Sequence, residues 1–445
     1  MKTEWTLHTC DRLEESYHET RHPSGLRMLV SSKDLSALYA VVGVGYGSRD
    51  RFAGGTLPMG TAHFLEHKMF EREDGSGWED VFSALGAEVN AYTSDDSTAY
   101  MVSCTEHMQE ALEALLSMVM ELHVTSASVA QERPIIAEEI CMNADDPWEA
   151  SFAEMLRCLY APTSKGGDPV REEICGSTSS ITRITESVLR TAHSRFYRPD
   201  NMVLAVAGRI TPAEVQAVAE RVMSTKRVDA LAEKLAPTTR RPHDPAAVHT
   251  PAASKDMPAA KPIFCIGIKA KALPKEPVAL ARRERLMTVL CEMLFSRSGD
   301  FYNDLFESGT VSPGMSYGSS VGRPAKGDTA DSYGYYYLSG ECDDPGRVYE
   351  AFRAYISSLH ERGLDATAFD RARRTLYADF VYGFDSTEGI ASSLMTAAMD
   401  GVELYDLLTM VETLNVEEVR ALLSEDFREP QFALSTILPD GRKER

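Results

Sequence analysis

Apolar residues along this chain of 445 residues fall into short continuous runs, separated by longer segments in which they recur at helical spacing. A run of about four to eight apolar residues bounded by turn-forming residues is typical of a buried strand. Runs of this kind predict strands over 26–30, 37–42, 202–207, 263–268, 333–338 and 432–437. Segment 108–122 instead places Leu112, Leu115 and Leu116 on one helical face. The pattern therefore predicts an α+β protein.

The front and back of the chain repeat one layout. In the front, a second helix is expected to begin near Ser126 or Ser128, whose hydroxyl can cap it, and to continue through Ile140. In the back, a helix over 348–360 is likewise followed by one over 369–382, which Asp365 or Thr367 can cap. Because element order, cap type and spacing agree, we infer an internal duplication of an α+β unit. Two similar halves joined by a linker can face each other and enclose a chamber.

The clearest change of composition covers residues 229–261. This segment has no sustained apolar period, and its prolines are Pro237, Pro242, Pro245, Pro251 and Pro258. Proline fixes φ and removes a backbone donor, so the segment is expected to be an extended surface linker. The predicted domains are therefore 1–228 and 262–445, joined by the linker 229–261.

Charge and cysteine content narrow the function classes. The formal net charge is −21, from 46 Lys and Arg against 67 Asp and Glu. A negatively charged surface repels phosphate backbones, which argues against a nucleic-acid partner. The same surface would tolerate basic peptides as partners; the alternative is that the charge serves solubility alone. The eight cysteines include no CxxC pair, which argues against a disulfide scaffold and a thiolate zinc site.

Hydropathy gives no sign of a membrane segment. No stretch approaches the roughly 20 uninterrupted apolar residues that a membrane helix needs. Residues 1–20 contain five acidic side chains and no apolar signal core. We therefore expect a cytoplasmic protein without a membrane partner.

The motif with the strongest chemical content lies in the sequence GTAHFLEHKMFE over 60–71. Positions four apart lie on one helical face, so His63 and His67 can direct imidazole nitrogens to one Zn²⁺ ion at about 2.0–2.1 Å. Glu66, beside His67, is placed to contact a water on the ion. On the motif alone, two solvated or hydrogen-bonded helix histidines remain the alternative.

A catalytic zinc usually has three protein ligands, and segment 131–140 offers the third. Its isoleucines Ile135, Ile136 and Ile140 are expected to mark the buried side. Glu132 and Glu139 are seven residues apart, two turns along one helical face. Glu139 can therefore reach the metal while Glu132 acts as an outer carboxylate that orients a ligand.

Four motifs together identify a family resemblance. They are HFLEHKMFE over 63–71, G-x-x-x-N-A-x-T over 86–93, E-R-x-I-I-x-x-E-I-x-M-x-x-D-x-P over 132–147 and F-Y-x-P-x-N-M over 196–202. In these motifs the sequence resembles the pitrilysin/insulinase-type zinc peptidases, the inverzincins, and most of all their shorter bacterial processing-peptidase members. The resemblance implies a mitochondrial-processing-peptidase-like fold, in which two similar α+β units form a clam-like chamber.

The resemblance also implies roles for individual residues. His63, His67 and Glu139 would bind one Zn²⁺ per chain, Glu66 would be the general base and Glu132 a supporting acid. Domain 1–228 would then be the zinc-bearing catalytic domain. Domain 262–445, whose one histidine is His360, would be a second chamber domain without metal.

Segment 88–92 resembles the edge strand with which the family pairs substrate backbone. An exposed strand edge offers unpaired N–H and C=O groups to an extended peptide. Asn90 and Ala91 are the expected contacts; the alternative for these two residues is an ordinary half-buried strand.

One stretch departs from the family pattern. In many relatives, the region of 301–309 carries an arginine, followed by a tyrosine, and the pair grips the substrate carbonyl. Here Phe306 stands about where the arginine would be, and Tyr317 follows at a different spacing. Our hypothesis is that the chain is the zinc-bearing half of a heterodimer, whose second, homologous chain supplies the Arg/Tyr pair.

The function expected from these features is zinc-dependent endopeptidase activity on short or unfolded peptides. The substrate would be peptides in general or the leader of one precursor. Two alternatives remain open: a non-catalytic structural or assembly subunit on the same fold, and a zinc-dependent peptide-binding module without turnover.

Overall fold

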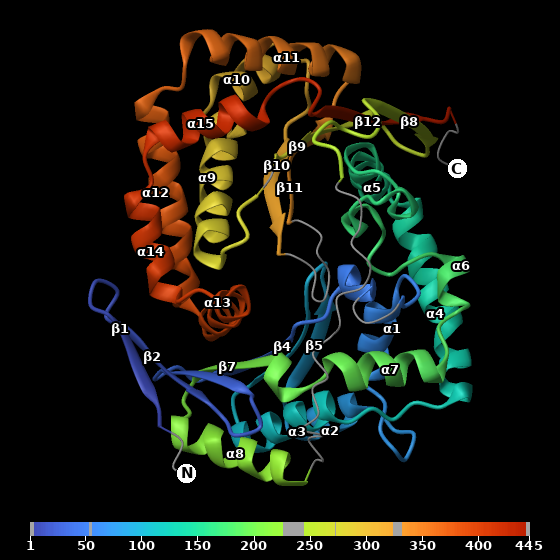
Figure 1. Cartoon of the computed structure of the whole chain (residues 1–445), viewed down its shortest axis with the longest axis vertical. Coiled ribbons are helices and arrows are strands. Elements are labelled where there is room, and N and C mark those ends of the chain that lie inside the picture. Colours follow the sequence, from blue (N-terminus) through green and yellow to red (C-terminus); the bar gives the residue numbers. More distant parts are fainter. Residues whose placement is uncertain (1–3, 53–55, 226–243, 272, 324–331, 442–445) are drawn as a thin grey trace. The chain divides into compact units, whose positions relative to one another are not determined.

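The computed structural model describes residues 4–52, 56–225, 244–271, 273–323 and 332–441 (Figure 1). The chain divides into two compact units. Unit 1 comprises Met1–Glu138, Glu173–Thr238 and Asp379–Asp406, and unit 2 comprises Glu139–Glu172, Thr239–Ala378 and Leu407–Arg445. Each unit thus draws on the front and the back of the chain, whereas the domains expected from the sequence, 1–228 and 262–445, are continuous. Those two boundaries stay a prediction.

Unit 1 is built on a seven-stranded sheet with the order β1-β2-β3-β7-β4-β6-β5. Its strands are β1 (Thr6–Cys10), β2 (Glu15–Arg21), β3 (Arg27–Ser32), β4 (Leu38–Val44), β5 (Glu88–Thr93), β6 (Thr98–Cys104) and β7 (Met202–Gly208). Only β3 and β7 pair in parallel; the other neighbours are antiparallel. Every residue of β7 is buried, while β5 alternates between exposed and half-buried residues. The strands expected over 26–30, 37–42 and 202–207 are confirmed as β3, β4 and β7.

Helices cover both faces of this sheet. Those lying wholly in unit 1 are α1 (Thr61–Lys68), α2 (Trp78–Ala84), α3 (Met108–Met120), α6 (Thr178–Ile181), α7 (Glu186–Phe196), α8 (Pro212–Thr225) and α13 (Thr387–Asp400). Helices α3 and α8 lie on one face and α13 on the other (Figure 1). Helix α4 (Ser126–Asp145) begins in unit 1 and continues without a break into unit 2. The two helices expected over 108–122 and from near residue 126 are confirmed as α3 and α4.

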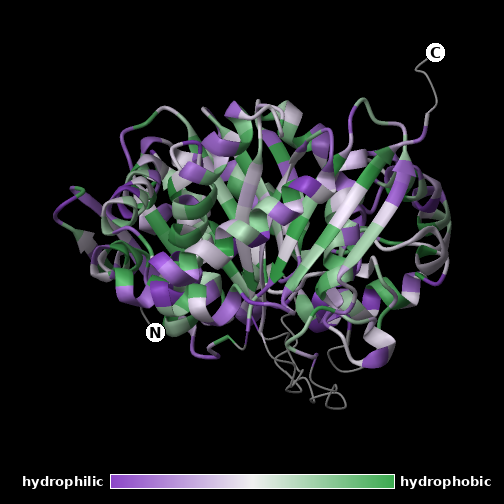
Figure 2. Ribbon diagram, turned by 90° about the horizontal axis from the view of Figure 1, so that it is seen from above, coloured by the Kyte–Doolittle hydropathy of each residue, from purple (hydrophilic) through white to green (hydrophobic). Residues whose placement is uncertain are grey.

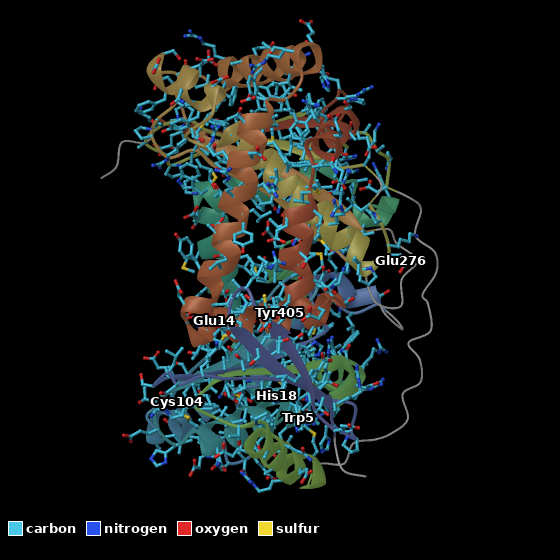
Figure 3. All side chains as sticks on the ribbon, turned by 90° about the vertical axis from the view of Figure 1, so that its left-hand side faces the viewer. Trp5, Glu14, His18, Cys104, Glu276 and Tyr405 are labelled. Carbon is cyan, nitrogen blue, oxygen red and sulfur yellow. The ribbon has the colours of Figure 1, made fainter. Side chains whose placement is uncertain are left out.

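Helix α13 joins unit 1 although it lies far along the chain. Its Met395 packs so closely on β4 that a Cβ atom at Gly43 would come within 2.6 Å of the Met395 sulfur. In the same segment, Glu403 accepts a hydrogen bond of 2.6 Å from the Tyr17 hydroxyl. The ring of Tyr405, labelled in Figure 3, lies 5.4 Å from the ring of Tyr17. The back of the chain therefore completes the front unit.

Unit 2 contains a five-stranded sheet with the order β10-β11-β9-β12-β8. Its strands are β8 (Ala252–Met257), β9 (Ile263–Lys269), β10 (Ser316–Gly322), β11 (Tyr333–Glu341) and β12 (Phe432–Pro439). Strands β8 and β12 pair in parallel and the others antiparallel. The strands expected over 263–268, 333–338 and 432–437 are confirmed. Of the expected linker, 229–243 lies outside the described residues, and the remainder includes β8 because that segment pairs with β12.

The helices of unit 2 repeat the arrangement of unit 1. They are α5 (Pro147–Leu159), α9 (Pro277–Phe295), α10 (Asp300–Glu307), α11 (Pro345–Arg362), α15 (Val416–Asp426) and most of α12 (Ala366–Tyr382) and α14 (Leu404–Thr413). Helix α5, from the front of the chain, packs on β9 and β12. A Cβ atom at Gly267 would come within 2.5 Å of the Met155 sulfur of α5, just as Gly43 faces Met395 in unit 1. Two similar α+β units, as expected from the sequence, are confirmed.

Hydropathy follows this layering. Figure 2 shows apolar residues concentrated along the strands and polar residues on the outer turns of many helices. Among the described residues, every helix is too short or too polar to span a lipid bilayer.

Candidate metal centre

Helix α1 carries the first two expected ligands in a buried position. It starts after Gly60, which has a φ of +82° and approaches so closely that a Cβ atom would lie 2.4 Å from the carbonyl oxygen of Cys175. All of its residues except His67 are buried, including Glu66 and Lys68. Polar groups in such a position need partners, because burying them without compensation is unfavourable. The side chains of α1 therefore form a network with neighbouring elements.

His63 and His67 lie together on one side of α1, with ring centroids 4.7 Å apart. Burial, and then the charge of nearby His67, lowers the pKa of His63 to about 4. An imidazole with that pKa is neutral at pH 7, and only the neutral form has a nitrogen lone pair that can bind a metal. The environment of His63 thus suits a metal ligand.

Glu139, on α4, completes a group of three donors. One ligand atom each from His63, His67 and Glu139 lies within 4.8 Å of the other two. Three donors around one zinc ion at about 2.0–2.2 Å can be at most about 4.4 Å apart, so small side-chain adjustments suffice to bind the ion. Two imidazoles and one carboxylate also form a donor set typical of a catalytic zinc site. The side chains that the sequence predicts as ligands therefore fit the metal.

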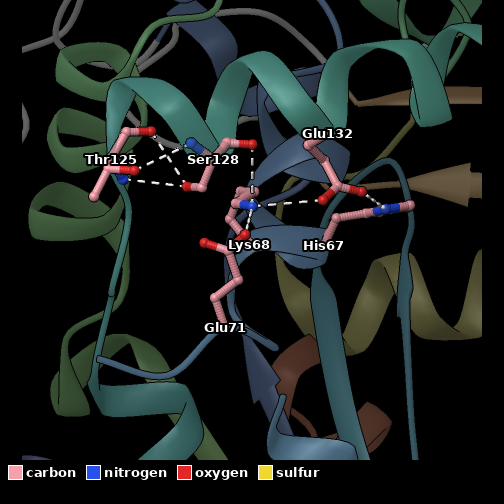
Figure 4. Close-up of polar contacts among 6 residues, drawn as sticks. All are labelled: His67, Lys68, Glu71, Thr125, Ser128 and Glu132. Atoms are coloured by element: carbon pink, nitrogen blue, oxygen red, sulfur yellow. Dashed lines mark hydrogen bonds and ion pairs between the residues drawn. The ribbon is translucent and has the colours of Figure 1, made fainter. Parts of the chain in front are cut away.

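Glu132 forms the outer contact expected of it (Figure 4). Its Oε1 lies 3.0 Å from Nδ1 of His67, and its Oε2 lies 3.5 Å from Nζ of Lys68. The hydrogen bond with His67, and then the charge of Lys68, lowers the pKa of Glu132 against the opposing effect of burial. An ionised carboxylate can only accept, so Nδ1 of His67 carries the proton and Nε2 is left for a metal.

Lys68 is an element of the site for which the sequence interpretation proposed no role. Its side chain is fully buried and forms an ion pair with Glu71 as well as with Glu132 (Figure 4). Its Nζ also donates to the carbonyl oxygen of Ser128, 3.5 Å away. The only sequence signal was its place directly after His67 in a helix with apolar residues on several sides.

Glu66 and the expected peptide-contacting residues line one cavity of about 390 Å³, together with His67 and Glu132. Glu66 is 9% exposed and accepts a hydrogen bond of 2.5 Å from Oγ1 of Thr93. Asn90 is exposed and Ala91 half-buried on β5, the last strand of the sheet order. The structure therefore brings the residues predicted for catalysis and peptide contact to one side of unit 1.

One sequence expectation about α4 is wrong. Ile136 is fully buried and Ile140 half-buried, as expected, but Ile135 is 56% exposed. The buried stripe of α4 instead contains Val129 and Ile136, a spacing of seven residues. Glu132 lies on the same stripe, and Ile135 points about 100° away from Ile136.

The two residues at the departure from the family pattern belong to unit 2. Phe306, on α10, is 44% exposed. The hydroxyl of Tyr317, on β10, donates a hydrogen bond of 2.6 Å to Glu292. Tyr317 is thus already engaged within its own unit.

Comparison with known proteins agrees with this geometry. The model "Insulinase (Peptidase family M16)" matches residues 31–166, and the model "Peptidase M16 inactive domain" matches residues 183–376. The second model is thus described as an inactive domain.

Relatives extend over nearly the whole chain. YmfH from Bacillus subtilis, named an uncharacterized zinc protease, is 28% identical and covers 96% of this chain and 98% of its own length. The mitochondrial-processing peptidase subunit beta of Caenorhabditis elegans is 23% identical over 94% of this chain and 89% of its own length. The crystal structure of an M16-like peptidase from Alicyclobacillus acidocaldarius superposes with a TM-score of 0.86, at 28% identity and 99% coverage of both chains. The chain therefore belongs to the M16 family of insulinase-type peptidases, whose cofactor is zinc.

Proposed function

We propose that this protein is a zinc-dependent endopeptidase acting on short or unfolded peptides. The observation that carries the proposal is the grouping of His63, His67 and Glu139 beside the buried Glu66. The family membership supports it, and so does the name zinc protease carried by several relatives. A non-catalytic subunit would have no need of all these groups in one place.

The chemistry follows from the donors and from Glu66. His63, His67 and Glu139 would hold Zn²⁺, which lowers the pKa of a bound water towards about 7 and polarises a carbonyl. Glu66 would accept the proton of the attacking water and pass it to the leaving amine nitrogen. Glu132 would keep His67 in the orientation that presents Nε2.

The free edge of β5 suggests how a peptide is held. Within the described residues β5 pairs only with β6, so its other edge can receive an extended peptide as an added strand. Asn90 and Ala91 are the proposed contacts at this edge. Only a segment without folded structure can lie along a strand edge, which favours short or unfolded substrates, including precursor leaders.

We further propose that activity requires a second homologous chain. By the family resemblance, the exposed Phe306 stands about where many relatives carry an arginine, and the second chain would supply that cation. A cation and a phenol that stabilise a developing oxyanion are worth several kcal/mol. One relative is named a subunit, which is consistent with a heterodimer. A cytoplasmic location also stays a prediction.

The test combines metal analysis with a peptidase assay. The purified protein should contain about one zinc per chain and cleave a fluorogenic unfolded peptide, alone or with the partner chain. Glu66→Gln should retain zinc and lose hydrolysis, since an amide cannot accept the water proton. The matched control is Glu138→Gln, an exposed residue of α4, which should cleave like the wild type.

Two outcomes would contradict the proposal. Hydrolysis by Glu66→Gln at the wild-type rate would exclude Glu66 as the base. A wild-type protein that binds no zinc, or that binds zinc and cleaves nothing even with its partner, would exclude the peptidase function.

A further inference from the structure

The carboxylate of Glu66 is held by a side chain that the sequence motifs leave without a role. Oγ1 of Thr93 donates to Oε2 of Glu66 across 2.5 Å, a short distance typical of a hydroxyl bonded to a charged oxygen. Glu66 is nearly buried, so this bond forms away from bulk water, where it is stronger than at a surface. A bond of this kind limits how far the carboxylate can rotate.

Thr93 is itself held in place at the end of β5, where residues 46–49 contact residues 94–98; these contacts are called the clamp below. The turn that follows it accepts two backbone hydrogen bonds of 3.0 Å. The amide of Ser48 donates to the Ser94 carbonyl, and the amide of Arg49 donates to the Asp95 carbonyl. The guanidinium of Arg49, which is fully buried, also donates to Asp96 across 2.8 Å. An edge strand has only one neighbouring strand, so these contacts supply the restraint that its free edge lacks.

Two more features show how closely the clamp fits. A Cβ atom at Gly47 would lie 2.3 Å from the backbone oxygen of Asp95, so the two loops can meet only because residue 47 is glycine. The buried hydroxyl of Thr98 donates to the carbonyl oxygen of Tyr46 across 2.9 Å and therefore does not compete with Thr93 for Glu66. The position of the Thr93 hydroxyl is thus determined from several sides.

We propose that Thr93 is a positioning residue for peptide hydrolysis. Its hydroxyl holds the Glu66 carboxylate in the orientation that accepts the proton of the attacking water. Thr93 also lies on the same strand as Asn90 and Ala91, so it links the general base to the strand that receives the peptide. The inference rests on the proposed peptidase function and extends it to a residue outside the proposed metal ligands and peptide contacts.

The proposal separates kcat from KM. A peptide added to β5 would bind through backbone groups near Asn90 and Ala91, which do not need the Thr93 hydroxyl. Loss of the hydroxyl should therefore slow turnover while peptide binding is kept. Thr93→Val, which has nearly the same shape, should lower kcat about tenfold and leave KM within about twofold, because hydrogen bonds to charged groups are strong.

The experiment uses the zinc-loaded full chain, with its partner if the wild type needs one. Thr93→Ser retains a hydroxyl and should recover kcat to within about threefold of the wild type. The matched control is Thr9→Val on β1, the same chemical change at an exposed strand position, which should leave kcat and KM unchanged. Zinc content and the thermal midpoint should be equal in all variants. If Thr93→Val does not unfold cooperatively, Thr93→Ala replaces it.

The results are distinguishable. A kcat of Thr93→Val within twofold of the wild type would overturn the proposal, and so would a Thr93→Ser variant as slow as Thr93→Val or an effect confined to KM. If the wild type itself cleaves no faster than Glu66→Gln, the proposed function has failed rather than the role of Thr93.

Discussion

Replacing Glu132 tests whether an outer carboxylate determines zinc affinity. In Glu132→Gln the side chain keeps its shape and one acceptor oxygen but loses its charge. In Glu132→Ala the hydrogen bond of 3.0 Å to Nδ1 of His67 and the ion pair with Lys68 are both lost. Glu132→Gln therefore removes only the negative charge beside His67, whereas Glu132→Ala removes the whole contact with His67.

The structure indicates the size of each step. A hydrogen bond from an imidazole N–H to a carboxylate is worth about 1.5–3 kcal/mol, and outer partners of metal-bound histidines usually contribute about 10–100-fold in metal affinity. We expect Glu132→Gln to weaken zinc binding about tenfold and Glu132→Ala about 100-fold. Lys68 is fully buried but keeps its ion pair with Glu71, so Glu132→Ala should still fold.

Zinc affinity is measured by competition with a chelator of known affinity, at fixed pH and salt. Glu138→Ala, on the same helix but exposed, serves as the control and should bind zinc like the wild type. If both Glu132 variants bind zinc within twofold of the wild type, then the carboxylate does not orient His67 and the interpretation of the site is wrong.

Two further predictions concern stability. Gly47→Ala should lower the free energy of unfolding by about 2–3 kcal/mol in chemical denaturation, because its Cβ would lie 2.3 Å from a carbonyl oxygen. In the control Gly383→Ala, the nearest new contact of the Cβ is 3.6 Å, so the free energy of unfolding should change by less than about 1 kcal/mol. Equal denaturation midpoints for the two variants would refute the clamp. The hydrogen bonds of Arg282 hold the pKa of Glu418 below its ordinary value of 4.5, so this carboxylate stabilises the fold above that pH and the effect is lost as pH falls through the folded pKa. Glu418→Gln should therefore cost about 1 kcal/mol at pH 7 and almost nothing in strong acid, whereas the exposed Glu361→Gln should match the wild type throughout; a loss that does not depend on pH would refute the assignment.

The metal donors could be predicted from the sequence because their geometry is local. A spacing of four residues puts His63 and His67 on one face of α1, and a spacing of seven puts Glu139 and its outer partner Glu132 on one face of α4, whatever the rest of the fold does. The expected strands were found for a similar reason, since central strands buried on both faces form continuous apolar runs. β7 is such a strand.

Other features depend on contacts that no local pattern encodes. Strands β1 and β2 carry few apolar residues and are held by pairing, β1 with β2 and β2 also with β3. The hydrogen bond from Thr93 to Glu66 joins residues 27 positions apart, and Lys68 pairs with Glu132 only when α4 packs against α1. Nor does the periodicity of α13 say which sheet it will cover, because an amphipathic helix fits many apolar faces.

The exchange of helices between front and back has a consequence for the autonomy of the two halves. A fragment ending at residue 228 would lack α13 and leave the β4–β7 face around Gly43 bare, and a fragment starting at residue 262 would lack α5 over Gly267. Neither fragment is self-sufficient, yet each carries the helix that the other is missing. If a peptide bond within 229–261 were cut, we therefore expect the two fragments to refold only together. Each fragment would supply a helix to the sheet of the other, as the two chains of a domain-swapped dimer do.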